Sequence, residues 1–199
     1  MVKKTYAEIA EVLKKFEIGG ITEQLINEYE KSFSEMPPEI ELNKTATLLS
    51  ALGHGKYDYE EGTWTPYTNG VYSFDVEVFD VERMYTNFLI GISALDKEEL
   101  EFKNIQEDTG NINWEAGIGT RTVTFEWKGK TFCLEAKVIN DWFDPNAAFA
   151  LNKIIIENGS GKRLFFADDG YQECIIFYRD TDWADSFQKE TGLVLSSET

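Results

Sequence analysis

His54 is the only histidine in the chain, and it lies in the run Gly53-His54-Gly55. A Ser-His-Asp or Cys-His site would have to use this residue as its base. No nucleophile elbow or metal-ligand spacing accompanies it, and a zinc site needs several ligands from a chain that offers one His and two Cys. The sequence therefore predicts a histidine in a loop or at a helix end, no cofactor and no metal centre.

Paired carboxylates are the second feature that could carry chemistry. Asp168-Asp169-Gly170 lies between two apolar segments, with further aspartates nearby in the sequence. Such oxygen donors suit a hard cation, and two carboxylates could divide the acid and base roles of glycoside cleavage. The alternating donors of a calcium loop are missing, however, and Asp-Gly is typical of hairpin turns. The run favours a turn, with a carboxylate-based hydrolase as an alternative function.

Aromatic rings and carboxylates occur together in the last third of the chain. Rings supply contact area and carboxylates pair with Lys and Arg, so this combination suits a basic protein partner. The alternative interpretation is that the rings belong to the core and the acids form a solvated rim. We predict a partner-binding face made of Asp141, Trp142, Asp144, Asp168, Asp169, Tyr171, Asp180, Asp182 and Trp183.

The overall charge limits the classes of partner. The chain has 36 Asp and Glu against 19 Lys and Arg, a net charge of -17 and a pI near 4.4. This field repels nucleic acids and anionic membranes and attracts basic protein surfaces. No secretory signal or membrane-length apolar run is visible. Cys133 and Cys174 lie in apolar segments, which favours reduced thiols over a disulfide. We expect a cytoplasmic monomer or homodimer that binds neither nucleic acid nor membrane and is not an enzyme.

The elements that must position these residues fall into two parts. Residues 1–56 read as three helices, because Thr5, Thr22 and Asn43 each precede a stripe of apolar residues at helical spacing. Residues 57–199 carry the strand patterns. They predict strands over 71–78 and 100–105, a hairpin over 121–138, strands over 163–167 and 173–178, and helices over 80–95, from about 145, and from 182. Residues 107–119 read as a loop.

This mixture predicts an α+β fold in which N-terminal helices pack with a mostly antiparallel sheet flanked by helices. Hairpin connections between several of the strands argue against a doubly wound parallel sheet. The length suits one α+β domain over residues 1–199.

Two segments resemble immunity proteins of bacterial polymorphic or contact-dependent toxin systems. They are Lys162–Tyr178, with the sequence KRLFFADDGYQECIIFY, and the helix containing Trp183-Ala184-Asp185-Ser186-Phe187. The resemblance implies an acidic cytosolic α+β protein that binds and neutralises a toxin domain, and it transfers no binding residue. A nuclease toxin is basic, so an acidic inhibitor gains association rate. A mobile-element accessory or structural protein is a further alternative.

Overall fold

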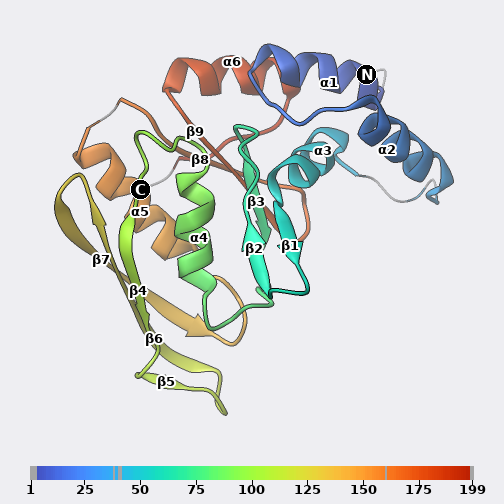
Figure 1. Ribbon diagram of the computed structural model, residues 1–199. Coiled ribbons are helices and arrows are strands. Elements are labelled where there is room, and N and C mark those ends of the chain that lie inside the picture. Colours follow the sequence, from blue (N-terminus) through green and yellow to red (C-terminus); the bar gives the residue numbers. More distant parts are fainter. Residues whose placement is uncertain (1–3, 38, 40–41, 160, 198–199) are drawn as a thin grey trace.

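The computed structural model describes residues 4–37, 39, 42–159 and 161–197, and its fold is α+β, as predicted (Figure 1). The described helices are α1 (Tyr6–Lys15), α2 (Glu23–Glu35), α3 (Lys44–Gly53), α4 (Met84–Ser93), α5 (Pro145–Glu157) and α6 (Thr181–Thr191). The described strands are β1 (Lys56–Asp58), β2 (Thr63–Thr65), β3 (Tyr72–Asp75), β4 (Lys103–Asp108), β5 (Ile112–Asn113), β6 (Ile118–Trp127), β7 (Lys130–Ile139), β8 (Arg163–Asp168) and β9 (Glu173–Arg179).

The first three helices begin where the sequence predicts, because each has a side-chain cap. Thr5 and Glu8 form a reciprocal capping box at α1. Thr22 accepts from the Leu25 N–H at α2, and Asn43 accepts from two N–H groups at α3. These bonds satisfy amide groups that the first turn of a helix leaves without partners.

All described strand pairs are antiparallel, but they form three sheets and not one. The sheets are the β1–β2 hairpin, a three-stranded sheet in the order β3-β9-β8, and a four-stranded sheet in which β6 pairs with β4, β5 and β7. The predicted hairpin is the β6–β7 pair, with Val123 opposite Leu134 and Phe125 opposite Phe132. Its two-residue turn, Lys128–Gly129, has positive φ at both positions, as tight hairpins require.

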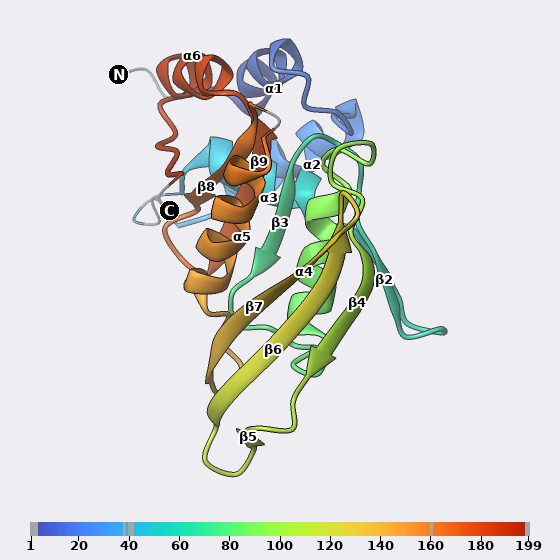
Figure 2. The same cartoon turned by 90° about the vertical axis from the view of Figure 1, so that its left-hand side faces the viewer.

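The three-stranded sheet separates two hydrophobic cores. One face of β8 and β9 packs in a core with α4, α5 and the inner face of β6–β7, and its side chains are Leu164, Phe166, Ile176 and Tyr178. The opposite face packs in a second core with α1, α3 and α6, and its side chains are Phe165, Ala167, Ile175 and Phe177. Both strands read as continuous apolar runs because both of their faces are buried. In Figure 2 the β6–β7 hairpin crosses the front of the molecule, and α4 and α5 pack between its sheet and the three-stranded sheet.

A buried ion pair joins α4 to the four-stranded sheet. Arg121 of β6 donates to Glu107 of β4 at 2.6 Å, and both side chains are almost completely buried. The second Glu107 oxygen accepts from the N–H and hydroxyl of Thr86, in the first turn of α4, which has no side-chain cap of its own. The prediction of a loop over residues 107–119 was wrong in three places. Glu107 and Asp108 complete β4, Ile112 and Asn113 form β5, and Ile118 and Gly119 begin β6.

Within the described ranges, no helix combines the length and the apolar character that crossing a bilayer requires.

Candidate functional site

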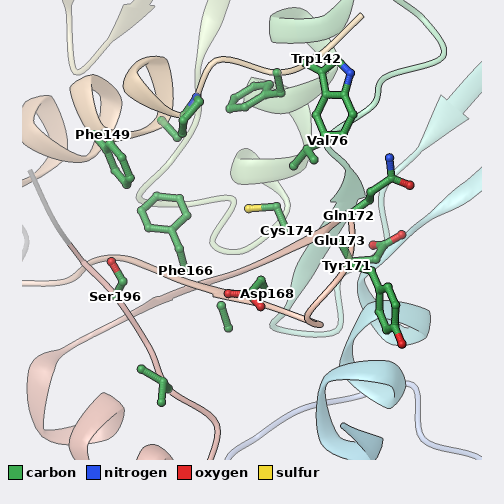
Figure 3. Close-up of a pocket in the computed structure, with 15 residues that line it drawn as sticks. Val76, Trp142, Phe149, Phe166, Asp168, Tyr171, Gln172, Glu173, Cys174 and Ser196 are labelled. Carbon is green, nitrogen blue, oxygen red and sulfur yellow. The ribbon is translucent and has the colours of Figure 1, made fainter. Parts of the chain in front are cut away.

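The larger of two adjoining surface cavities lies between α5 and the start of β9 and has a volume of about 490 Å³. Phe149 and Phe166 line one side, with ring centroids 5.6 Å apart. Trp142, Tyr171 and Gln172 line the opposite side (Figure 3). We call this the first cavity; its lining is mostly apolar.

Three residues of the predicted face meet at the first cavity. Trp142 is 40% exposed, Tyr171 is 66% exposed, and the carboxylate of Asp168 is exposed beside them. Large rings are usually covered by the rest of the chain, so two exposed rings at one cavity are typical of a binding surface.

The carboxylates of Asp168 and Asp169 also build the turn between β8 and β9. One Asp168 oxygen accepts from the Gly170 N–H at 2.9 Å. One Asp169 oxygen accepts from the N–H groups of Tyr171 at 2.9 Å and Glu173 at 3.1 Å. The turn therefore fixes where Tyr171 stands at the cavity.

Asp144 does not belong to the predicted face, so this prediction was wrong. The residue is only 2% exposed, and its carboxylate caps α5 by accepting from the N–H and side-chain amide of Asn146. Its other oxygen accepts from the Lys137 N–H at 2.8 Å. Asp141 is half-buried next to Trp142 but does not line the first cavity.

The remaining predicted residues lie at the other end of β9. Asp180 caps α6 by accepting from the Trp183 N–H, and Asp182 is exposed in the first turn. The Trp183 ring stacks on Phe187 with centroids 4.7 Å apart, as part of the packing of α6. At about 3.3 Å per residue, β9 separates these residues from Tyr171 by roughly 20 Å. The structure thus divides the predicted face into two groups.

The second cavity, of about 260 Å³, lies between the β1–β2 hairpin, β3 and the start of α4. His54 lines it together with five aromatic residues and three carboxylates: Tyr57, Trp64, Tyr72, Phe74, Phe79, Asp75, Glu77 and Asp80. The Phe79 side chain is 97% exposed.

Two side-chain hydrogen bonds connect the linings of the two cavities. Gln172 donates from Nε2 to Glu77 Oε2 at 2.8 Å. His54 Nε2 lies 2.8 Å from Glu173 Oε1, and Glu173 lines the first cavity. The cavities therefore share a wall that contains two carboxylates, and a partner seated on one cavity lies beside the other.

The chemistry around His54 lacks an activated nucleophile. The hydrogen bond to Glu173 raises the pKa of His54. Ser73, which also lines the second cavity, donates its hydroxyl to the Ser50 carbonyl at 2.7 Å. Burial raises the pKa of the Cys174 thiol to about 12, so this thiol stays protonated at neutral pH. In the described part of the chain, no group of three or more His, Cys, Asp or Glu is arranged to hold a metal ion.

Comparison of the chain with protein-family models, with curated proteins and with solved structures gives no match. The resemblance to immunity proteins therefore stays a prediction from residues 162–187.

The sequence did not reveal the second cavity. Its wall depends on the contact between His54 and Glu173, which are 119 positions apart, and on the contact between Glu77 and Gln172, which are 95 positions apart. One local signal existed: Phe79 and Asp80 follow the alternating strand pattern of 71–78, which leaves a large ring outside that pattern.

Proposed function

We propose that the protein is a non-catalytic, cytoplasmic binding protein that neutralises a basic toxin domain by holding it on the face around the first cavity. One observation supports this most: Trp142 and Tyr171 are exposed at an apolar cavity beside Asp168, in a chain of net charge -17. Buried rings at the centre of an interface and charges at its rim are the usual division of work in protein recognition.

The neighbourhood of His54 favours binding over catalysis. Ser73 is 1% exposed and its hydroxyl is bonded to backbone, while the Cys174 thiol is protonated at neutral pH. General-base catalysis of acyl transfer needs a nucleophile within hydrogen-bond reach of the histidine. The His54 side chain is hydrogen-bonded instead to Glu173, and this bond ties α3 to β9.

The contribution of the exposed rings is tested with Trp142→Ala. The partner is first isolated by pull-down from the native host, and the measurement is binding kinetics on the immobilised partner. We expect Kd to rise at least about tenfold, mainly through faster dissociation, because a central ring acts after docking. The matched control is Trp114→Ala, since Trp114 is 50% exposed and lines neither cavity.

The contribution of the rim charge is tested with Asp168→Asn. The amide keeps the oxygen that accepts from Gly170, so the turn remains while one charge is removed. We expect association to slow about two- to threefold and its salt dependence to weaken. Asp185→Asn on α6 removes the same charge from an exposed site away from both cavities. Equal effects of the two variants, or a partner that is acidic, would contradict the proposal.

A further inference from the structure

The second cavity has a rigid aromatic floor. Trp64, Tyr72 and Phe74 form a row in which neighbouring ring centroids are 5.8 and 5.5 Å apart. Trp64 donates from Nε1 to the backbone carbonyl of His54 at 2.8 Å, which fixes its indole ring. Tyr72 is almost completely buried, and burial raises the pKa of its hydroxyl, so this ring stays neutral. The floor is therefore in place before a ligand arrives, which lowers the entropy cost of binding.

The wall of the same cavity carries oriented carboxylates. Asp75 accepts from the Glu77 N–H at 2.9 Å, and Glu77 accepts from Gln172 at 2.8 Å. In each of these two carboxylates, one oxygen accepts a hydrogen bond that holds the side chain in place. Among the described residues, the other oxygen of each has no hydrogen-bond partner. Of the residues that the structure describes, no Lys or Arg lines the cavity, and the basic residue that does, His54, is hydrogen-bonded to Glu173 and not to Asp75 or Glu77.

The size of the cavity indicates how much of a ligand it accepts. Its volume of about 260 Å³ is below the roughly 300–1,000 Å³ of sites that enclose drug-sized ligands. One side chain fits this space better than a whole metabolite. The exposed Phe79 ring at the same cavity offers further contact area to the chain that carries such a side chain.

Aromatic faces beside paired carboxylates attract a cation, and a planar guanidinium uses both. It stacks on rings and donates to carboxylates in a fork, whereas an ammonium is a more strongly hydrated point charge. We propose that the second cavity receives an arginine side chain of the basic partner. That the arginine comes from a basic partner rests on the proposed function. The preference of the cavity for a guanidinium group depends only on the residues of this chain.

The preference is measured by NMR on the full chain without any partner. The probes are Nα-acetyl-arginine amide, its lysine counterpart and its norleucine counterpart, and the signal followed is the Trp64 indole N–H. We expect saturable binding of the arginine probe with a Kd on the order of millimolar, severalfold weaker binding of the lysine probe, and none of norleucine. Free L-arginine is titrated in parallel to distinguish a free amino acid from a side chain within a protein.

The carboxylates are tested with the double variant Asp75→Asn, Glu77→Gln, which keeps shape and acceptor oxygens and removes two charges. We expect the arginine probe to bind at least about tenfold more weakly. The control is Glu60→Gln, Glu61→Gln on the neighbouring β1–β2 turn, where both acids are exposed and neither lines the cavity. This control should leave the affinity for the probe within about twofold.

Several results would overturn the assignment. They are no saturable shift of Trp64, equal shifts from the norleucine probe, equal affinity in the double variant, or free L-arginine binding tenfold more tightly than the capped probe. The Trp142→Ala variant separates the two proposals, because it should weaken binding of the partner and leave the affinity for the arginine probe unchanged. If the arginine probe does not bind but binding of the partner still requires Trp142, the proposed function stands and this inference is wrong.

Discussion

His54 and Glu173 show what one hydrogen bond between distant residues does in this chain. Their contact at 2.8 Å ties the end of α3 to the first residue of β9. The sequence predicts a histidine in a loop or at a helix end, and His54 is the C-cap of α3. No local pattern predicts its partner, because hydrogen-bond partners from different elements are set by packing and not by spacing.

The pair gives stability a pH dependence of known sign. The hydrogen bond with Glu173 raises the pKa of His54 above its usual 6.5. The stabilisation from protonated His54 is therefore fully present below about pH 6.5. This contribution is lost as the pH rises through the folded-state pKa. We expect the difference in Tm between the unchanged chain and His54→Gln to be largest near about pH 6 and to shrink towards about pH 9. A difference that stays constant over this range would show that the charge of His54 is not involved.

Arg121 and Glu107 form a buried ion pair. The guanidinium is 1% exposed, and among the described residues its Nη2 has no hydrogen-bond partner, so Glu107 is its main compensation. Glu107→Gln leaves a buried charge without a counter-ion, and we expect a loss of about 3–5 kcal/mol in the free energy of unfolding by urea. In the exposed pair with Lys103, Glu101→Gln should cost less than about 1 kcal/mol. A small loss for Glu107→Gln would indicate that water or a shifted partner compensates Arg121.

Among the elements, those with local signals are the ones the sequence predicts. Capping residues mark α1, α2 and α3, and the alternating pattern with a Lys-Gly turn marks β6–β7. The β1–β2 hairpin was not predicted, because its strands have three residues each and bury almost nothing. The division of the strands among three sheets was also not predicted, since pairing such as β3 with β9 depends on distant segments.

The outer edge of β8 is closed by two devices. Buried Asn152 of α5 accepts from the Leu164 N–H at 2.7 Å and donates to the Leu164 carbonyl at 3.0 Å, as a neighbouring strand would. Two residues further along β8, Ser196 exchanges both backbone hydrogen bonds with Phe166. These bonds leave less of the edge open to another chain.

Asn152→Leu tests the first device. The substitution keeps the size of the side chain but leaves a buried N–H and a buried carbonyl of Leu164 without partners. We expect a loss of about 2–5 kcal/mol in the free energy of unfolding, although a more apolar residue is buried. Lys153→Leu, at an exposed position of the same helix, should change stability by less than about 0.5 kcal/mol. A stable Asn152→Leu variant would mean that the edge finds another partner.

For the whole molecule, charge is the property that the sequence fixes most directly. With 36 acidic and 19 basic residues, the folded chain repels itself, and salt screens that repulsion. We expect Tm to rise by a few degrees between about 20 and 300 mM NaCl, and by the same amount in KCl. A fall in Tm with salt would show that favourable ion pairs outweigh the repulsion.

The candidate site was predicted only in part. Trp142, Asp168 and Tyr171 line one cavity, because the β8–β9 turn and the Trp142 segment carry them on the surface. Asp144 is buried as a helix cap, and Trp183 packs α6, since rings and carboxylates serve the interior and the surface equally well. Sequence composition identifies a residue as able to bind a partner, whereas burial decides whether it can.

The place of β9 has a consequence for how the chain acquires its fold. β9 is the central strand of its sheet, both cores pack against it, and it pairs with β3. Tyr72 lies opposite Ile176, about 100 residues away in the chain, and such long loop closure slows folding. Neither core has its central strand until residues 173–179 have left the ribosome. We expect folding to follow synthesis of most of the chain, so that shorter nascent chains expose apolar strands and depend on chaperones.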